Sequence, residues 1–431
     1  MSRIARHVVI DVSPLRRSRD LRYLIAGQLI SELGSQLTVV TVPYQVYLLT
    51  HSSLDVGLVS LAQLVPLIVG SLLGGSLADV IDRRLLLLVT QLLMAASIAG
   101  LAINADLGPS LWPLFVLPAL AQGFSAICDA GRSAMLPNLV RRSEVSTANA
   151  MFQVLFQVGT VVGPAIAGLL LAGAGVKFVY WLDVAGLGAA TLGVFLISAQ
   201  RPVAGSSSHP PGLRSILEGL SFVRGRQAIQ GAYLLDINAM VFGMPRALFP
   251  ALALTGFGGG ARTLGFLYAA PGAGALIGAV TTGWVGRVQR QGRAVIIAVL
   301  VWGAAISCFG LVHWLPLALL LLAVAGCADV ISAVFRSTII QLAIPDALRG
   351  RLMGLQTAVV TGGPRVGDVE SGAVAAAFGD TTSVVSGGLA CIVGALLLAR
   401  ALPGFRRQNT ADAAPEPATA VPDGSPEVAS S

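Results

Sequence analysis

The sequence predicts an all-α membrane protein with twelve transmembrane helices in two pseudo-symmetric six-helix bundles. Of its 431 residues, 55% are hydrophobic and only 11% are charged, a composition that suits helices in contact with lipid rather than a soluble core. The apolar residues form runs of about 20, the length that crosses a hydrocarbon layer of about 30 Å. The glycines of the first half also recur in the second half, which predicts a duplicated six-helix unit.

Twelve apolar runs account for the predicted helices, six in each half of the chain. The runs of the first half are Leu24–Leu49, Val56–Leu77, Leu85–Ile103, Leu111–Leu136, Val145–Ala172 and Phe178–Ser198. The runs of the second half are Ile229–Leu254, Thr263–Val285, Ala294–Val312, Leu315–Ile344, Leu352–Phe378 and Thr382–Leu402. Each run is long enough for one membrane crossing as a helix.

Two pairs of segments carry the repeat. GLVSLAQLVPLIVGSLLGG, which begins at Gly57, aligns with GFLYAAPGAGALIGAVTTG, which begins at Gly265. Farther along, GTVVGPAIAG from Gly159 aligns with GPRVGDVESG from Gly363. A duplicated unit of this kind is typical of transporters in which one half rocks against the other around a site between them.

The net charge of +7 is distributed as a topology signal. Arginines crowd the N-terminus and then every second loop, whereas the intervening loops hold only Lys177 and Arg262. The arginine-rich segments are Arg16–Arg22, Arg83–Arg84, Arg141–Arg142, Arg201–Arg226, Arg287–Arg293, Arg349–Arg351 and Arg406–Arg407. Because arginine marks cytoplasmic loops, both termini of this multi-pass protein are predicted to lie on the cytoplasmic side of the plasma or inner membrane. The partner of the basic surplus is then the lipid bilayer, not a nucleic acid.

The chain is expected to divide into five parts. Residues 1–20 form a basic cytoplasmic N-terminal arm, and residues 21–198 form the first six-helix bundle. Residues 199–226 contain a Pro/Ser/Gly linker, RPVAGSSSHPPG, followed by a short amphipathic helix. Residues 227–403 form the second bundle, and residues 404–431, rich in Ala, Pro and Glu, form a disordered cytoplasmic tail.

The loop after the second predicted helix, GSLADVIDRR, combines a small residue with charges of both signs. Gly75 permits close approach of a neighbouring helix. Asp79 can cap the next helix or pair with an arginine, and Arg83 and Arg84 can anchor the loop at the inner membrane surface.

This loop resembles the signature loop of the major facilitator superfamily, in which a glycine precedes an Asp–Arg pair and a later basic pair. It departs from that signature at Val80, where the family usually has arginine, and at Asp82, where the family usually has glycine. The resemblance implies that the loop gates the cytoplasmic side through charge pairs formed in one conformation. Anchoring of the topology alone is the alternative.

The fifth predicted helix carries Gly159, Gly163, Pro164 and Gly168. Proline removes one backbone hydrogen bond, and the glycines permit bending and close helix contact. The spacing resembles the antiporter motif of the same superfamily, with Ala167 in place of one glycine. The resemblance favours an exporter over an importer.

Four further stretches resemble the enterobactin exporter subfamily and related actinobacterial drug and siderophore efflux proteins. They are VPYQVYLLTHSSLDVGL from Val42, PRALFPALAL from Pro245, LGFLYAAPGAGALIGA from Leu264 and IPDALRGRLMGL from Ile344. The resemblance implies a secondary active transporter, functional as a monomer, that exports an amphipathic small molecule by alternating access. The cargo would be a siderophore or a drug, and protons would drive its export.

Ionisable residues deep in a bilayer are costly unless they are paired or hydrated, so each one needs a reason. Glu32 lies within the first predicted helix, one turn after Gln28, and Asp236 and Arg246 lie within the seventh. By resemblance to the superfamily, these helices line the central cavity. Glu32 and Asp236 are therefore the candidates for proton coupling, with Gln28 and Arg246 as substrate contacts or charge partners. A static buried ion pair or a polar packing contact is the alternative for each.

Two acid–arginine sets fall near the cytoplasmic ends of the fourth and tenth predicted helices. They are Asp129 with Arg132, and Asp329 with Arg336. One hypothesis is an inner latch between the two halves. The alternative is that the arginines reach to the membrane surface, as long basic side chains commonly do.

Two further observations limit the assignment of proton coupling. Arg365 and Asp368 lie three residues apart on one predicted helix, so they are expected to form a structural ion pair. The superfamily often has an arginine three residues before a Gln–Gly pair in its fourth helix, and this chain has Ala119 there. Another residue must take that role if protons drive transport.

The sequence has no phosphate-binding loop, metal-ligand spacing or nucleophile–base pair, so neither an enzyme nor a cofactor is predicted. Arg246 and Arg365 favour an anionic cargo, whereas Glu32 and Asp236 favour a cationic one. Two alternatives stay open. One is a nutrient importer of the same fold, and the other is a non-transporting membrane sensor or lipid scramblase.

Overall fold

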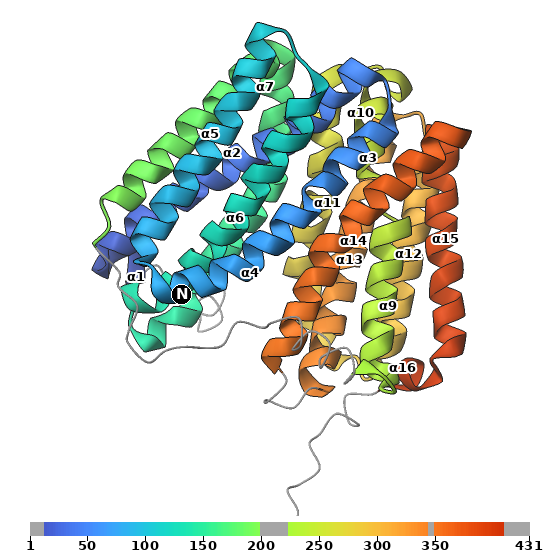
Figure 1. Cartoon of the computed structure of the whole chain (residues 1–431). Helices are drawn as coiled ribbons and strands as arrows, with labels where there is room; N and C mark the ends of the chain where they lie inside the picture. The colour runs from blue at the N-terminus through green and yellow to red at the C-terminus, as the bar shows by residue number, and fades with distance from the viewer. Residues whose placement is uncertain (1–12, 199–222, 344–348, 409–431) are drawn as a thin grey trace, which may run out of the picture.

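A computed structural model describes residues 13–198, 223–343 and 349–408 of the chain, and every regular element in these ranges is a helix. The helices form two halves that lie side by side (Figure 1). The predicted linker with its amphipathic helix lies largely outside the described residues, as do the first twelve residues and most of the predicted tail. The all-helical prediction is confirmed for the described part of the chain.

The first half contains helices α1 to α7. Their bounds are α1 Ser13–Arg17, α2 Arg19–Thr50, α3 Ser53–Ala62, α4 Leu64–Val80, α5 Arg83–Leu107, α6 Leu111–Leu139, the short η2 Arg142–Glu144, and α7 Val145–Phe195. Polar side chains cap several of these helices: the Ser18 hydroxyl accepts a hydrogen bond from the Leu21 amide, and the Ser52 hydroxyl accepts one from the Asp55 amide. Such caps fix where the helices begin after short loops.

The second half contains α9 to α16. Their bounds are α9 Gln227–Phe242, η3 Arg246–Leu248, α10 Phe249–Ala251, η4 Leu252–Gly256, α11 Gly260–Thr281, η5 Thr282–Arg287, α12 Gln291–Leu311, α13 Leu315–Ala343, α14 Arg349–Phe378, α15 Asp380–Ala401 and α16 Pro403–Arg407. The seventh predicted helix is interrupted between α9 and η3, where Pro245 has no N–H to donate to a continuous helix.

Nine helical segments of the described residues are long and apolar enough to cross a membrane. One of them is α7, whose 51 residues cover two predicted helices. Its backbone leaves the helical conformation at Gly175, with φ 80° and ψ 174°, which confirms a break between the fifth and sixth predicted helices. Two predicted crossings, α2 and α14, are not among the nine although they are 32 and 30 residues long.

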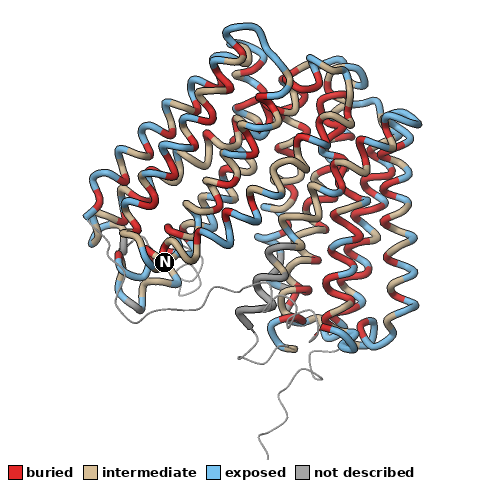
Figure 2. The backbone as a smooth tube through the Cα atoms, in the orientation of Figure 1, coloured by how far each residue is buried: buried red, intermediate tan, exposed pale blue. Residues whose placement is uncertain are grey.

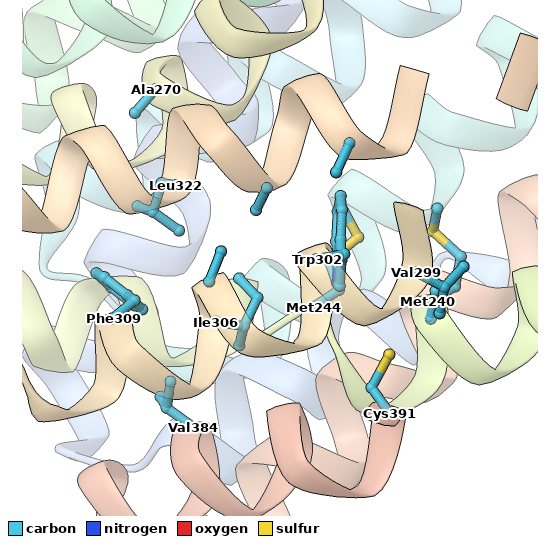
Figure 3. Close-up of a cluster of buried hydrophobic side chains, with 14 of the residues drawn as sticks. Met240, Met244, Ala270, Val299, Trp302, Ile306, Phe309, Leu322, Val384 and Cys391 are labelled. Carbon is cyan, nitrogen blue, oxygen red and sulfur yellow. The ribbon is translucent and has the colours of Figure 1, made fainter. Parts of the chain in front are cut away.

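Buried residues concentrate where helices of one half face one another, and exposed residues follow the outer faces of the helices (Figure 2). Large apolar side chains are exposed there, among them Val65, Leu92 and Leu192, as expected for surfaces that contact lipid. The largest apolar cluster lies mostly in the second half, where Trp302, Phe309 and their neighbours pack (Figure 3), and it continues into the first half through residues such as Leu37 and Leu171.

The two halves converge at one end and diverge at the other, where α1 and α16 lie (Figure 1). At the converging end, α3 packs on α14 and α11 packs on α7. This end, called the sealed end below, carries the loops with few arginines.

Candidate functional site

A cavity of about 240 Å³ lies between the two halves, next to the sealed end. Its first-half walls come from α2, α3, α5, α6 and α7, and its second-half walls from η3, α11 and α14. Four charged residues line it: Asp183, Arg246, Arg365 and Asp368. Neutral polar groups add hydrogen-bonding capacity, namely Ser35, Thr38, Ser60, Gln63, Gln122, Ser125 and Tyr268.

Asp183 enters the cavity from the second segment of α7 and is 2% exposed. The Thr38 hydroxyl donates a hydrogen bond to Asp183 Oδ2 at 2.5 Å, whereas Asp183 Oδ1 has no hydrogen-bond partner among the described residues. Gly34 makes room for this carboxylate, since a side chain there would overlap it. Asp183 is not among the residues predicted above, although an acidic residue inside a predicted crossing is a signal of a functional site.

The second half contributes a different carboxylate to the cavity, that of Asp368 on α14, which is 7% exposed. The Ser60 hydroxyl of α3 donates to Asp368 Oδ2 at 2.5 Å, and Asp368 Oδ1 has no partner in the described part of the chain. The expected ion pair with Arg365 is therefore wrong. Arg365 Nη1 donates instead to the Thr361 carbonyl oxygen, one turn back on the same helix, at 2.6 Å.

Arg246 is exposed to the cavity from η3, as the sequence analysis expected of a cavity-facing group. The Tyr268 hydroxyl donates to its backbone oxygen at 3.3 Å and so fixes the η3 backbone against α11. With two arginines and two carboxylates, the cavity offers charges of both signs. It can therefore hold a cargo that carries polar groups on an apolar frame.

Glu32 and Gln28, by contrast, are not among the cavity-lining residues. Gln36 Nε2 donates to Glu32 Oε1 at 3.1 Å. A Cβ atom on Gly159 would lie 2.5 Å from Glu32 Cγ, and one on Gly163 would lie 2.5 Å from Gln36 Cβ. The polar side chains of Glu32 and Gln36 on α2 therefore pack against two glycines of the antiporter-like motif. Glu32 faces α7 instead of the cavity.

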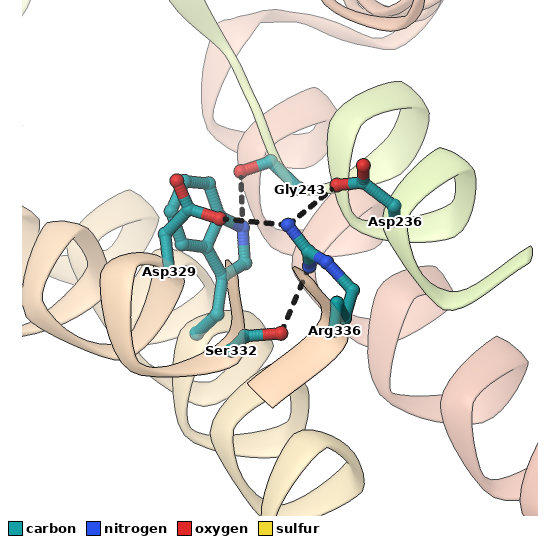
Figure 4. A network of polar contacts seen from close by, with 6 residues as sticks. Asp236, Gly243, Asp329, Ser332 and Arg336 are labelled. Carbon is teal, nitrogen blue, oxygen red and sulfur yellow. Dashed lines mark hydrogen bonds and ion pairs between the residues drawn. The ribbon is translucent and has the colours of Figure 1, made fainter. Parts of the chain in front are cut away.

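Asp236 also lies away from the cavity lining, because its face of α9 packs against α13. Arg336 Nη2 lies 2.8 Å from Asp236 Oδ1 and 3.7 Å from Asp329 Oδ1, and Arg336 Nη1 donates to the Ser332 hydroxyl at 2.8 Å (Figure 4). Both Asp236 and Arg336 are buried. This cluster matches the alternative interpretation of Asp236, a buried ion pair.

Neither acid–arginine set joins the two halves in this conformation. Arg132 pairs with Asp129 at 2.8 Å within α6, and the Asp129 side chain is 56% exposed. The ion pairs of Asp329 and Arg336 stay within the second half. The halves diverge at the end where these sets lie (Figure 1), and among the described residues no ion pair joins either set to the other half.

The GSLADVIDRR loop differs from expectation in two ways. Gly75 has nothing within 4 Å of an added Cβ, and Gly74 is the residue that approaches α6. Asp82, not Asp79, caps α5, since its carboxylate accepts a hydrogen bond from the Arg84 amide at 2.8 Å. No ion pair of Asp79 occurs within the described ranges.

The two arginines of this loop form hydrogen bonds to backbone oxygens of other helices in the first half. Arg83 is buried and donates to the Ala134 carbonyl oxygen at 2.8 Å. Arg84 donates to the Phe195 carbonyl oxygen at 2.5 Å and lies over the Phe195 ring. In this conformation both side chains therefore tie α5 to α6 and α7.

Two helix crossings close the sealed end. In the first crossing, a Cβ atom on Gly372 of α14 would lie 2.6 Å from the Ser53 carbonyl oxygen of α3, and one on Gly57 would overlap the Asp368 backbone. Only glycine allows backbones to approach so closely. The Ser53 hydroxyl also donates to Asp380 Oδ1 at 3.2 Å and adds a polar contact between the halves.

The second crossing repeats this arrangement with the halves exchanged. A Cβ atom on Gly168 of α7 would lie 2.8 Å from the Ala261 carbonyl oxygen of α11, and one on Gly265 would lie 2.6 Å from the Pro164 carbonyl oxygen. These residues align with those of the first crossing in the sequence repeat: Gly57 with Gly265, Ser53 with Ala261, Gly372 with Gly168, and Asp368 with Pro164. The repeat therefore builds both closures of the cavity.

The cavity and its two crossings define a class, a membrane transporter of the major facilitator type. A sequence model of the transmembrane secretion effector family, MFS_3, matches residues 10–423, and the chain belongs to this family of the major facilitator superfamily. The resemblance inferred from the sequence is confirmed. Among the described residues, no group of three His, Cys, Asp or Glu side chains is placed to hold a metal ion.

Relatives of known name support this class. The enterobactin exporter EntS of Escherichia coli O1:K1 / APEC is 31% identical over 400 residues, covering 93% of this chain and 95% of the relative. The enterobactin exporter EntS of Shigella boydii serotype 18 matches with the same identity and coverage.

Solved structures share the fold at low sequence identity. The nucleoside transporter NupG superposes with a TM-score of 0.68 at 12% identity, covering 90% of this chain and 99% of that one. A bacterial homologue of the human lysosomal transporter Spinster, in an inward-facing and unoccupied conformation, gives a TM-score of 0.70 at 13% identity, with coverages of 90% and 98%.

Proposed function

We propose that the protein exports an amphipathic small molecule from the cell by alternating access, driven by protons. The observation that supports this most strongly is the charged cavity between two halves that meet at one end only. In this proposal the sealed end faces the outside, and the structure corresponds to the inward-facing state of a monomer. The chain then crosses the plasma or inner membrane twelve times, with both termini in the cytoplasm.

A siderophore is the proposed cargo. The named relatives are enterobactin exporters, and the cavity presents two arginines, Arg246 and Arg365, that suit the oxygen-rich acidic groups of such molecules. A cationic amphipathic drug is the second candidate, because the carboxylates of Asp183 and Asp368 each leave one oxygen free. An importer of the same fold, or a non-transporting sensor or scramblase, would not be expected to show outward-directed transport.

Glu32 is the proposed proton carrier of the first half. Its carboxylate accepts a hydrogen bond from Gln36, and its side chain packs against Gly159 of the antiporter-like motif, so a change of its charge acts directly on the α2–α7 contact. For Asp236 we propose a structural role, since Arg336 already compensates its charge. The proposed inner gate consists of the Gly75–Arg84 loop with the acid–arginine sets of α6 and α13, which would meet when the inner ends close.

Transport into inverted membrane vesicles tests the proposal. An imposed gradient, acidic inside, should drive uptake of a siderophore, and a protonophore should abolish it. Dyes of either charge serve as the comparison cargo. Arg246→Gln should lower siderophore uptake more than uptake of a cationic dye, whereas Arg400→Gln, outside the cavity, should change neither. If no cargo accumulates under any gradient, the exporter proposal fails.

A further inference from the structure

Asp368 belongs to two parts of the molecule at once. Its carboxylate lines the cavity, and its backbone and carboxylate both take part in the first crossing. The Ser60 hydroxyl, from the other half, donates to Oδ2, while the buried Oδ1 has no hydrogen-bond partner in the described part of the chain. A group placed in this way can sense the contents of the cavity and act on the contact between the halves.

The two crossings differ at the repeat positions of Asp368 and Ser60. At the position of Asp368, the second crossing has Pro164, and at the position of Ser60 it has Tyr268. Both crossings share the glycine contacts, but only the first carries a carboxylate bonded across the halves. The difference isolates Asp368 as a group that the scaffold of the seal does not require.

We propose that Asp368 is a proton-binding site that controls the sealed end: the neutral carboxyl group keeps the first crossing closed, and the ionised carboxylate favours its opening. This inference rests on the proposed function, in which the sealed end opens to the outside during transport. It adds a second protonation site that is distinct from Glu32, and it gives that site a mechanical consequence.

The physical reason is the cost of keeping an ionised carboxylate from water. In the closed crossing, the Ser60 hydroxyl donates to Oδ2 and the backbone of Ala247 lies close to the carboxylate, but Oδ1 has no hydrogen-bond partner in the described part of the chain, and an unpaired charged oxygen in a buried site is unfavourable. Opening the crossing would hydrate Asp368. Proton binding and closure therefore favour each other, and each shifts the equilibrium of the other by the same factor.

The charged and titratable groups around Asp368 do not replace the missing partner. Arg246 faces it from η3, Tyr268 from α11 and Arg365 from its own helix. Neither arginine forms an ion pair with it in the described ranges, since Arg365 is bonded to Thr361. A cationic or hydrogen-bond-donating group of the cargo beside Asp368 would stabilise the ionised carboxylate and so compete with the proton, so that loading of the cavity releases a proton and loosens the seal.

Accessibility of a reporter cysteine from outside the cell tests this inference without any cargo. In a background that lacks the four native cysteines, Val56→Cys places a thiol on α3, at a buried position that lines the cavity. A membrane-impermeant maleimide added to whole cells reacts with it only when the sealed end opens. The labelling rate is divided at each pH by the rate for the denatured protein, because the thiolate is the reacting form and its fraction rises with pH in any protein. This ratio should rise with external pH in the otherwise unchanged protein. With Asp368→Asn, the rise should disappear, and labelling at alkaline pH should be roughly tenfold slower.

Matched variants separate the carboxylate from the rest of the seal. Asp380→Asn changes the other carboxylate that is bonded across the halves, and it should keep the pH response. Asp368→Glu should also keep it, and Ser60→Ala should raise labelling roughly fivefold at every pH. The inference is overturned if Asp368→Asn retains the pH response or if Asp380→Asn removes it. If Asp368→Asn does not fold, a Ser60→Ala protein that labels like its parent overturns it as well.

The two proposals fail in different ways. Glu32→Gln should abolish proton-driven uptake in vesicles but leave the pH response of labelling in place. Absence of any proton-driven transport, together with an Asp368-dependent labelling response, would refute the proposed function alone. Proton-driven transport with labelling that ignores Asp368 would refute the inference alone.

Discussion

The two crossings of the sealed end differ in chemistry although their backbones approach in the same way. Gly57 and Gly372 form the first, and Gly265 and Gly168 form the second. Around these glycines, the first crossing carries an acidic residue, Asp368, and the second has proline at the same position of the repeat. Duplication therefore supplied a symmetric closure, and substitution in one copy placed an ionisable group where it can act on that closure.

A second buried acid, Asp236, differs from Asp368 because its charge is compensated by an ion pair. Asp236 has a guanidinium 2.8 Å away, from Arg336, whereas Asp368 has neutral hydrogen-bonding groups from Ser60 and the Ala247 backbone and no ion pair within the described residues. Breaking a buried ion pair leaves a charge uncompensated. Asp368 has no such pair to lose, so its ionisation can change during a transport cycle at a smaller structural cost.

The largest effect is expected where a fixed pair is broken. Arg336→Met leaves Asp236 and Asp329 without their shared cation and should lower the free energy of unfolding by about 3–5 kcal/mol. Adding Asp236→Asn should recover much of that loss. Thermal unfolding of the purified proteins measures both. Asp368→Asn should destabilise the protein far less, and an equal loss would erase the distinction between the two acids.

Filling either crossing should have the next largest effect, and the same effect in both. Gly168→Val and Gly57→Val each push a side chain into the opposing backbone, at a cost of about 1–3 kcal/mol to the sealed state. Reporter labelling from outside should rise, and transport should fall. Gly173→Val is the control on α7, since nothing lies within 4 Å of its added Cβ. A change in only one crossing would show that the seal is not symmetric.

The cavity carboxylate that lies outside both crossings should affect cargo but not the seal. Asp183→Asn removes a charge while its amide oxygen can still accept from Thr38. Export of a cationic dye should drop roughly tenfold, as expected when a hydrogen bond to a charged group is lost. Transport at several dye concentrations measures this. If the pH response of the sealed end disappears in Asp183→Asn, then Asp183 and not Asp368 controls the seal.

The smallest effects should come from the serine hydroxyls of the first crossing. Ser60→Ala removes the donor to Asp368 and should weaken the sealed state by about 1 kcal/mol, whereas Ser53→Ala removes a longer bond to the less buried Asp380 and should cost less. Reporter labelling at fixed pH ranks the two. If Ser53→Ala has the larger effect, the main polar contact of the seal is Ser53 with Asp380 and not Ser60 with Asp368.

The sequence was sufficient for the all-helical fold class, the family and the positions of the repeated glycines. Long apolar runs and recurring glycines are local signals that survive without tertiary information. The break at Gly175 followed from the same signals. What local patterns do not contain is the rotation of each helix about its own axis, because neighbouring residues on a helix point about 100° apart.

That missing rotation explains the errors in the candidate site. Gly74, not its neighbour Gly75, meets α6, and Glu32 faces α7 rather than the cavity. Asp368 turns toward α3 and Ser60, away from the arginine one turn before it. Partners that lie hundreds of residues apart in the chain decide these orientations, so one sequence taken alone did not reveal them.

The distance across the first crossing, measured as a function of pH, tests the central claim most directly. Spin labels at the exposed positions His51 and Ala377 lie on the two sides of this crossing. The account predicts a short distance at acidic pH, a growing population of longer distances as the pH rises, and a short distance at every pH in Asp368→Asn. The same pH-dependent lengthening in Asp368→Asn would contradict it.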